Sequence, residues 1–249
     1  MVKDRIMKAA FPKYIAEEIT RAFDANTTGP FRKMFITKSD NVTIVFADID
    51  GFTSISSIYS AERLVNMLNE IFISFDKIAD KYHQLRLKIL GDCYYCICGV
   101  PEPRTDHAHL SVCMGFGIIN AIKTISTKVS MRVGIHTGSV LSGVIGLSQW
   151  QFDVLGQDVK IANLMESSGI AGKVHITHVT RALISNDYVI TPSKAGQKVE
   201  FLKRAGIRTF FIAQATNQQQ AEAAEDEDIS QPDTEERLHA IPDMYDTPS

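Results

Sequence analysis

Two aspartates in this sequence are placed where they could bind divalent cations. Asp48 lies in the run FADIDGFTS (residues 46–54), and Asp92 lies in the run LKILGDCYY (residues 87–95). Each follows an apolar, strand-like segment and has a glycine nearby. Magnesium prefers oxygen ligands and completes its shell with waters and substrate phosphates. Two ions bridged by such carboxylates can activate an attacking oxygen and stabilise a leaving one, so the pattern predicts metal-dependent nucleotide chemistry.

A structural role is the alternative for each aspartate. Asp48 would then cap a turn, and Asp92 would be an ordinary residue at the tip of a hairpin. The segment GFTS (residues 51–54), which follows Asp48 closely, weighs against this alternative. A glycine-containing turn ahead of a helix exposes backbone N–H groups, and these favour phosphate.

The spacing of apolar residues predicts the elements that must position these aspartates. In the first half we expect helices at 4–23, from Ser60 to about His83 and from about His107 to Ser126, with strands at 42–47, 85–90 and 93–99. In the second half we expect strands at 129–136 and 140–146 around a Gly138-Ser139 turn, a helix at 157–167, a strand at 174–176, a short helix from Thr177, and strands near 199–203 and 208–213. The Gly91-Asp92 linker favours a type II′ hairpin.

This order indicates an α/β (α+β) fold with a ferredoxin-like βαββαβ core, extra C-terminal strands and helices, and helices on one face of the sheet. The first strand can then lie beside the hairpin, which would bring Asp48 and Asp92 together. We divide the chain into a connecting helix (1–25), a loop (26–40), a catalytic-type domain (41–214) and an acidic, disordered tail (215–249). The leading helix can connect to an upstream segment or pack on its own domain, and both options stay open.

Charge and length are compatible with a single domain that binds a polyphosphate. The chain has 249 residues, enough for a full core. Of its 26 basic and 29 acidic residues, one arginine and ten acidic residues fall in 215–249, which leaves 25 basic against 19 acidic residues in 1–214. This mildly basic body fits a polyphosphate, and solubility explains it equally well.

We expect no nucleic-acid partner and no signal peptide, and the apolar stretch 110–122 is too short to span a bilayer.

The cysteines indicate a reducing compartment, because three of the four crowd into one strand-like segment. Cys93 and Cys96 have the spacing of a zinc-ligand pair, and His107 and His109 are the nearby candidates for a second pair. The interpretation we favour is that the cysteines are small buried strand residues.

Four motifs together resemble the catalytic domain of the class III nucleotidyl cyclases. They are the two aspartate runs, MRVGIHTG (residues 131–138) and WQFDV (residues 150–154). KILGDCYYC (residues 88–96) looks most like the first catalytic domain, C1, of the membrane-bound animal adenylyl cyclases, and residues 4–23 resemble the helix that precedes it. The resemblance covers about residues 41–213. It implies the ferredoxin-like fold, conversion of ATP to cyclic AMP and pyrophosphate, and an active site shared by two catalytic domains.

The resemblance assigns roles residue by residue. Asp48 and Asp92 match the aspartates that bind two Mg²⁺ ions, for which Mn²⁺ can substitute, and Ile49 matches a main-chain metal ligand. Arg132 matches the arginine that contacts the triphosphate or its transition state, a role suited to the several donors of a guanidinium. The remaining matches to the nucleotide-binding positions are Asp50, Gly51, Phe52, Thr53, Leu90 and Gly91.

In this family, two further positions determine whether the enzyme selects adenine or guanine. Adenylyl cyclases use lysine and an acidic or polar partner, whereas guanylyl cyclases use glutamate and cysteine. This sequence has Lys88 and Asp153, which favours adenine over the guanylyl alternative. In two-domain cyclases the other domain reads the base, so Lys88 and Asp153 can equally face the non-catalytic mirror site.

The sequence departs from the complementary C2 half at two catalytic positions. That half supplies an asparagine and an arginine four residues apart on one helix face. Here Lys160 replaces the asparagine and Leu164 replaces the arginine, and leucine cannot donate to phosphate. We therefore expect a heterodimer with a C2-type domain. Leu155 and Gly156 also stand where the family often has Trp-Ser, which makes a response to the diterpene forskolin doubtful.

Other interpretations stay open. Paired aspartates alone also fit a diguanylate cyclase or a polymerase palm on the same core. Leu164 favours a catalytically silent half that only supports a partner, whereas Asp48, Asp92 and Arg132 oppose it. The resemblance further implies the cytoplasmic side of a membrane protein, attached through flanking parts, and regulation by heterotrimeric G-protein subunits. No residue here identifies such a contact.

Overall fold

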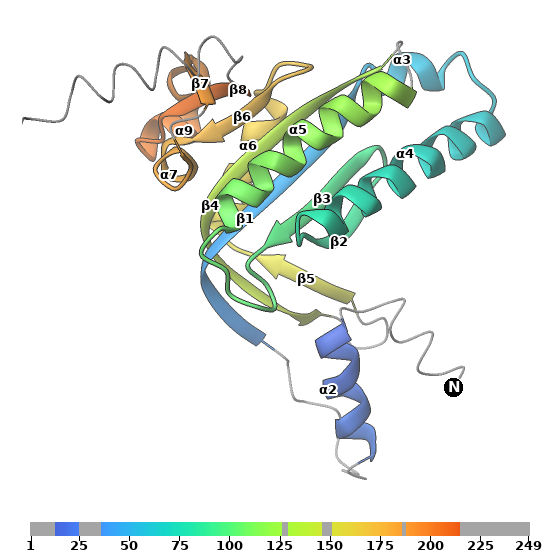
Figure 1. The fold of residues 1–249 in the computed structure, drawn as a ribbon, viewed down its shortest axis with the longest axis vertical. Coiled ribbons are helices and arrows are strands. Elements are labelled where there is room, and N and C mark those ends of the chain that lie inside the picture. The colour runs from blue at the N-terminus through green and yellow to red at the C-terminus, as the bar shows by residue number, and fades with distance from the viewer. Residues whose placement is uncertain (1–12, 25–35, 126–128, 146–150, 186–187, 215–249) are drawn as a thin grey trace, which may run out of the picture.

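The computed structural model describes residues 13–24, 36–125, 129–145, 151–185 and 188–214, which form the fold in Figure 1. The helices are α2 (Lys13–Asp24), α3 (Phe52–Ser56), α4 (Ala61–Lys81), α5 (His107–Ile125), α6 (Gln157–Ser167), α7 (His178–Arg181), α8 (Ala195–Lys198) and α9 (Glu200–Arg204). The strands are β1 (Ile36–Asp50), β2 (Leu85–Leu90), β3 (Cys93–Cys98), β4 (Ser130–Ile145), β5 (Gln151–Leu155), β6 (Val174–Thr177), β7 (Tyr188–Ser193) and β8 (Thr209–Gln214).

The predicted βαββαβ order is confirmed by β1, α4, β2, β3, α5 and β4. The strands lie in the order β2-β3-β1-β4-β6-β8-β7, with β5 paired to β4 beside this path. β1 is antiparallel to both β3 and β4. The hairpin tip therefore lies beside the end of β1, and Asp48 pairs with Cys93, the residue after Asp92.

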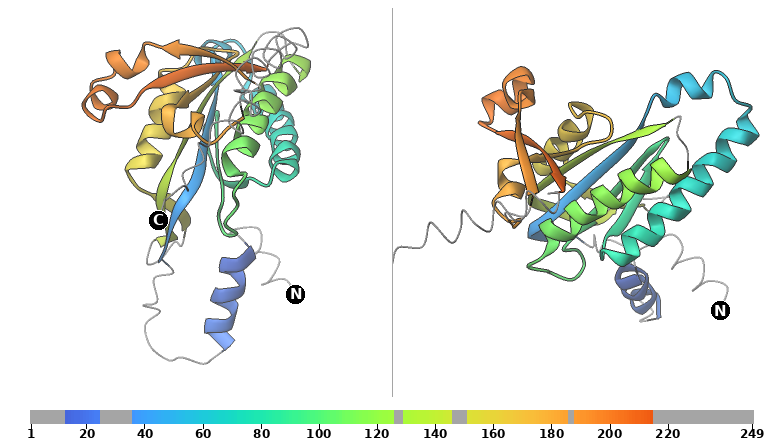
Figure 2. Two further views of the ribbon diagram at one scale, coloured as in Figure 1. Left: turned by 60° about the vertical axis from the view of Figure 1, so that its left-hand side comes forward. Right: turned by 45° about the horizontal axis from the view of Figure 1, so that its top comes forward.

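Alternation along β1 sends its side chains into two different cores. Val45, Ala47 and Ile49 lie in a large core with α4 and α5. Ile44 and Phe46 lie in a second core with residues of α2, β5 and α6. Figure 2 shows α4 and α5 on one side of the sheet and α6 on the other. The expectation of helices on one face is therefore wrong for α6. By the same alternation, the side chains of Asp48 and Asp50 lie on the face of the sheet that α6 covers.

The local signals around α4 and the hairpin are confirmed. The Ser60 side chain accepts a hydrogen bond from the backbone N–H of Arg63 at the start of α4. Gly91 has a φ of 67° and Asp92 does not have a positive φ, which is the sign pattern of a type II′ turn. Among the described residues, α5 is the one helix long and apolar enough to cross a bilayer, but it packs against β1 and β4 of the sheet and beside α4.

The predicted turn at Gly138-Ser139 is wrong, because β4 runs unbroken from Ser130 to Ile145. Its pairing with β1 extends over both halves, with a register shift between Ser39 and Val42. Gly138 serves another purpose. A Cβ there would lie 2.3 Å from Cγ of Asp158, so glycine gives room for that carboxylate.

Several boundaries also need correction. The predicted loop 26–40 is wrong from residue 36, where β1 begins, and its earlier part lies outside the described residues. The segment 199–203 is mostly helix α9 rather than a strand, and β5 and β7 were not predicted. Of the predicted helix 4–23, the described part is α2. Its residues Ile15 and Ile19 are buried in the second core, so α2 packs on its own domain. The tail 215–249 lies outside the described residues.

Candidate active site

The structure brings Asp48 and Arg132 together at the end of the two central strands. The two residues are directly paired across β1 and β4. Nη2 of Arg132 donates to Oδ2 of Asp48 at 2.7 Å, and Nη1 donates to Oδ1 of Asp50 at 3.1 Å. Asp48 and Asp50 are two residues apart in β1, so they lie on the same face of the sheet. Asp48 therefore does not follow the first strand, as predicted, but is part of it.

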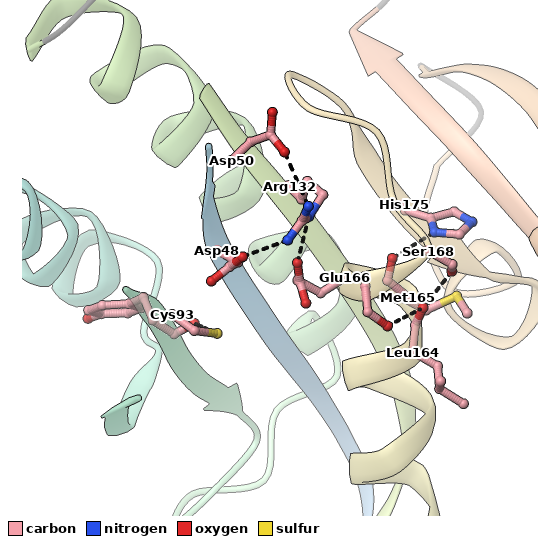
Figure 3. A network of polar contacts seen from close by, with 11 residues as sticks. Asp48, Asp50, Cys93, Arg132, Leu164, Met165, Glu166, Ser168 and His175 are labelled. Atoms are coloured by element: carbon pink, nitrogen blue, oxygen red, sulfur yellow. Dashed lines mark hydrogen bonds and ion pairs between the residues drawn. The ribbon is translucent and has the colours of Figure 1, made fainter. Parts of the chain in front are cut away.

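A third carboxylate, Glu166 of α6, completes this cluster and was not predicted from the sequence. Its Oε1 accepts from Nε of Arg132 at 2.8 Å, as Figure 3 shows. Glu166 is buried together with Ile161, Ala162 and Met165 on one face of α6. A glutamate on the apolar face of a helix needs a cationic partner, and this was the signal that could have identified it.

Glycine lets α6 lie directly on the sheet at this point. A Cβ on Gly134 of β4 would come within 2.0 Å of the backbone N of Glu166. Gly134 is two residues from Arg132, on the same strand face. The motif MRVGIHTG therefore provides both the arginine and the close approach of the helix that bears its partner.

Electrostatics at Asp48 favours the arrival of positive charge. Burial, the neighbouring Asp92 carboxylate and Glu166 raise the pKa of Asp48 from 3.8 to about 6, while Arg132 opposes the shift. Like charges held together in a partly buried site repel each other. A cation shared by Asp48 and Asp92 would relieve that repulsion.

The donor set fits a divalent metal ion whose remaining ligands are phosphates and waters. Within the described parts of the chain, no three His, Cys, Asp or Glu side chains form a ready-made metal cage. Asp48 and Asp92 supply two carboxylates, and Mg²⁺ in nucleotide sites is typically held by one or two carboxylates with phosphates and waters completing the shell. The side chain of Ile49 is buried in the first core, so only its main chain can contribute.

The turns beside the aspartates have the predicted glycine geometry. Gly51 adopts a left-handed conformation with φ 79° and precedes the short helix α3, which begins at Phe52. Phe52 packs against the first core, whereas Thr53 is exposed. On the hairpin side, Leu90 is half exposed and leads into Gly91. Gly51, Phe52 and Thr53 thus lie where β1 leads into α3, and Leu90 and Gly91 lie at the tip of the β2-β3 hairpin.

Lys88 and Asp153 meet in a cavity on the same face of the sheet. Nζ of Lys88 lies 2.6 Å from Oδ2 of Asp153, and both side chains are mostly buried. The cavity has a volume of about 390 Å³ and is lined by Phe46, Lys88, Leu90, Tyr95, Asp153, Val154, Leu155, Gly156, Val159, Lys160 and Asn163. Phe46 is two residues from Asp48, which puts the cavity roughly 7 Å along β1 from the carboxylate cluster.

The cavity wall contains a polar atom without a partner. Tyr95 stacks on Phe46 with ring centroids 4.2 Å apart, and its buried hydroxyl has no hydrogen-bond partner among the described residues. An unpaired buried hydroxyl is costly. Because this hydroxyl is itself fully buried, it faces protein atoms rather than the open cavity.

The two residues that depart from the C2 pattern make other contacts. Lys160 places Nζ 4.3 Å from the ring centroid of Phe201, and it also lines the cavity. Leu164 packs with Val199, Phe201 and Ile207 beside α9. Neither side chain belongs to the carboxylate cluster.

The structure excludes the zinc interpretation of the cysteines. Cys93 packs with the second core and Cys96 lies in the first, so the two thiols point to opposite faces of the sheet. Burial raises the pKa of Cys93 to about 12 and the pKa of Cys96 well above its usual value. Nδ1 of His107 is hydrogen-bonded to Thr43 at 2.7 Å. All four cysteines are free.

Comparison with known proteins gives a consistent result. Residues 34–214 match a family model described as the adenylate and guanylate cyclase catalytic domain. Adenylate cyclase type 9 of Xenopus laevis is 36% identical over 85% of this chain, and adenylyl cyclase X E of Drosophila melanogaster is 38% identical over 74% of it. The chain spans only 19% and 17% of the lengths of these relatives.

Solved structures with this fold include enzymes named for both bases. The guanylate cyclase domain of RhGC from Catenaria anguillulae, in complex with GTP, is 30% identical, with a TM-score of 0.66 over 72% of this chain and all of that one. The adenylyl cyclase CyaB from P. aeruginosa is 25% identical, with a TM-score of 0.66 over 73% of this chain and 97% of that one.

Proposed function

Because this chain belongs to the adenylate and guanylate cyclase catalytic domain family, we propose that it is one half of an adenylyl cyclase that converts ATP to cyclic AMP and pyrophosphate. The observation that carries this proposal is the meeting of Asp48, Asp50 and Arg132 at the hairpin that bears Asp92. Carboxylates next to an arginine can hold a metal-bound triphosphate, and few other substrates need both.

In this proposal each residue has a defined task. Two Mg²⁺ ions, or Mn²⁺ in their place, would lower the pKa of the ribose 3′-hydroxyl and stabilise charge on the triphosphate. Asp48 and Asp92 would hold the ions, with the main chain of Ile49. Arg132 would donate to the phosphate oxygens, and the turns at Gly51 and Gly91 would border the phosphates.

The missing catalytic groups imply a partner. Leu164 sits in an apolar cluster and has no donor for phosphate, so we infer that a C2-type domain supplies the asparagine and the arginine. Leu90 and Leu155, both about half exposed at the cavity wall, give that domain an apolar contact surface. In such a heterodimer, Lys88 and Asp153 would face the mirror site rather than the adenine.

The setting of the domain is also part of the proposal. The relatives are about five times longer than this chain. We infer that the chain is a cytoplasmic piece of a membrane protein, with heterotrimeric G-protein subunits as candidate regulators.

A reconstitution tests the enzymatic proposal. The chain would be mixed with a C2-type domain carrying both missing residues, and the product of ATP and Mg²⁺ would be identified by mass spectrometry. We expect cyclic AMP from the pair and little from either part alone.

The competing candidate is a catalytically silent half, which the apolar surroundings of Leu164 favour. Asp92→Asn in the assembled pair separates the two. A loss of activity supports the metal half-site, whereas unchanged turnover would mean that the chain only supports its partner.

A further inference from the structure

Arg132 is held most firmly by a residue outside the metal motif. Its contact with Glu166 joins Nε to Oε1 at 2.8 Å. The Glu166 side chain is 8% exposed, compared with 19% for Asp48 and 45% for Asp50. Hydrogen bonds between charged groups are stronger where water is excluded. The helix α6, rather than β1, therefore supplies the best-shielded partner of this arginine.

The end of α6 that bears Glu166 is held by contacts with two strands, β4 and β6. The backbone of Glu166 lies against Gly134, where no Cβ would fit. Nδ1 of His175, in β6, donates to the carbonyl of Met165 at 2.7 Å. Figure 3 shows the contact between His175 and Met165 next to Glu166. The backbone of Glu166 therefore cannot move away from Arg132 unless the helix moves.

The contacts of Arg132 use different nitrogens and can be broken separately. Nη2 is bonded to Oδ2 of Asp48, whereas Nε is bonded to Glu166. A cation held by Asp48 would compete with Nη2 for the carboxylate oxygens, and its binding would exchange one positive partner of Asp48 for another. That exchange takes no atom from the contact between Nε and Glu166.

We propose that Glu166 is the positioning residue of Arg132, which it anchors through Nε while Asp48 exchanges Nη2 for a cation. This inference rests on the proposed function, because the cations are those of the cyclase reaction. The guanidinium is planar, so an anchored Nε fixes the direction in which both Nη groups point. Without Glu166, Arg132 pairs only with Asp48 and Asp50 and competes with the cation for them.

A double-mutant cycle on the chain alone tests this proposal through Mn²⁺ binding, measured by electron paramagnetic resonance without nucleotide. Glu166→Ala should weaken Mn²⁺ binding about tenfold, the effect of losing one charged hydrogen bond. Glu166→Gln should weaken it less, because the amide oxygen still accepts from Nε. Arg132→Ala should bind Mn²⁺ at least as tightly as the unmodified chain, and adding Glu166→Ala to it should change binding by less than about twofold.

Glu200 provides a matched control. Its Oε1 accepts from Nε of Arg204 at the same 2.8 Å, but both side chains are exposed. Glu200→Ala should leave Mn²⁺ binding unchanged. The proposal is wrong if Glu166→Ala has no effect. It is also wrong if that substitution weakens binding equally in the Arg132→Ala chain, because Glu166 would then act on the cation through its own charge.

The cycle and the proposed function can fail separately. If Glu166→Ala does not fold, as judged by circular dichroism, Glu166→Gln carries the same comparison in both backgrounds. The Mn²⁺ measurement needs no turnover. A reconstituted pair that makes no cyclic AMP would overturn the proposed function, while the cycle would still decide whether Glu166 acts through Arg132.

Discussion

At the scale of single residues, the site is a cluster of four carboxylates around one arginine. Asp48, Asp50 and Glu166 all contact Arg132, and Asp92 lies near enough to raise the pKa of Asp48. One cation among four carboxylates leaves the cluster short of positive charge. This shortage makes the cluster receptive to divalent ions, and it also makes its properties depend on pH.

Asp48→Asn tests that charge balance. The pKa of Asp48 is raised to about 6 in the folded chain, so the native state binds this proton more tightly than the unfolded state does. The free energy of unfolding should therefore fall as the pH rises from about 4 to 6 without divalent ions. Asn mimics the protonated form, so Asp48→Asn should be more stable than the unmodified chain at pH 8, with the difference shrinking toward pH 4.

Urea unfolding at both pH values measures this difference. Asp40→Asn is a suitable control, because Asp40 is exposed and pairs only with Lys38 among the described residues. A variant Asp48→Asn less stable than the unmodified chain at pH 8 would contradict the charge balance. In the reconstituted pair the same variant should lose roughly two to three orders of magnitude in rate.

At the scale of elements, the close contact between α6 and β4 decides where Glu166 lies. Gly134→Ala would place Cβ against the backbone of Met165 and Glu166, which cannot move like the end of a side chain. We expect a loss of about 3 kcal/mol or more in the free energy of unfolding. Gly115→Ala, which meets only side-chain methyl groups at 3.2 Å, should change it by less than about 1 kcal/mol, since alanine also favours the helix.

Urea denaturation of both variants makes the comparison. Equal losses at Gly134 and Gly115 would mean that α6 can shift away from the strand. In that case the position of Glu166 would not be fixed by β4.

The elements also show how far sequence patterns reach. Helix α4 has strong periodicity and a clear cap at Ser60, and it is predicted well. The bounds of α6 are also predicted well, although no side chain caps its start. The turn predicted at Gly138-Ser139 was wrong because glycine occurs both in turns and where another group packs closely. Only the position of Asp158 in the structure shows that Gly138 is of the second kind. Asp48 and Asp92 stand out in the sequence through their motifs, and their role as metal ligands stays a prediction. For Glu166 the sequence offers only a glutamate on an apolar helix face, because its partner Arg132 is 34 residues away in the chain.

At the scale of the whole molecule, the proposed function gives this chain a nearly complete metal half and an incomplete ribose half. Lys160 and Leu164 are the two departures, and both pack beside Phe201. If a second copy of the chain can take the place of a C2-type domain, restoring both groups should create activity. The dimer interface and the chemistry can therefore be tested separately.

The double variant Lys160→Asn with Leu164→Arg should give a self-sufficient enzyme. We expect cyclic AMP formation at least tenfold above that of the unmodified chain, because an arginine at the phosphate site contributes strongly to the rate. The rate should rise with the square of the chain concentration while the dimer is weak. A control with Leu164→Met keeps the apolar packing and should stay inactive. An unmodified chain that is as fast as the heterodimer would contradict the half-site.

Lys88→Ala distinguishes the two roles of the cavity. In the proposed heterodimer with a C2-type domain, Lys88 would face the mirror site, so the KM for ATP should stay within about twofold. In the self-sufficient double variant the same cavity would read adenine, and loss of a charged hydrogen bond should raise the KM roughly tenfold. A tenfold rise in the heterodimer would place Lys88 at the substrate instead.

The long pairing of β1 with β4 has a mechanical consequence. Their register runs from Ile36 opposite Gly143 to Asp50 opposite Ser130, and α2 packs into the core beside the first part of this ladder. About 40 Å of strand therefore joins the region near α2 to the carboxylates. Hydrogen-bonded strands resist bending and stretching far more than a loop does. A torque applied upstream of β1 would therefore move Asp48 and Arg132 with little loss along the strands.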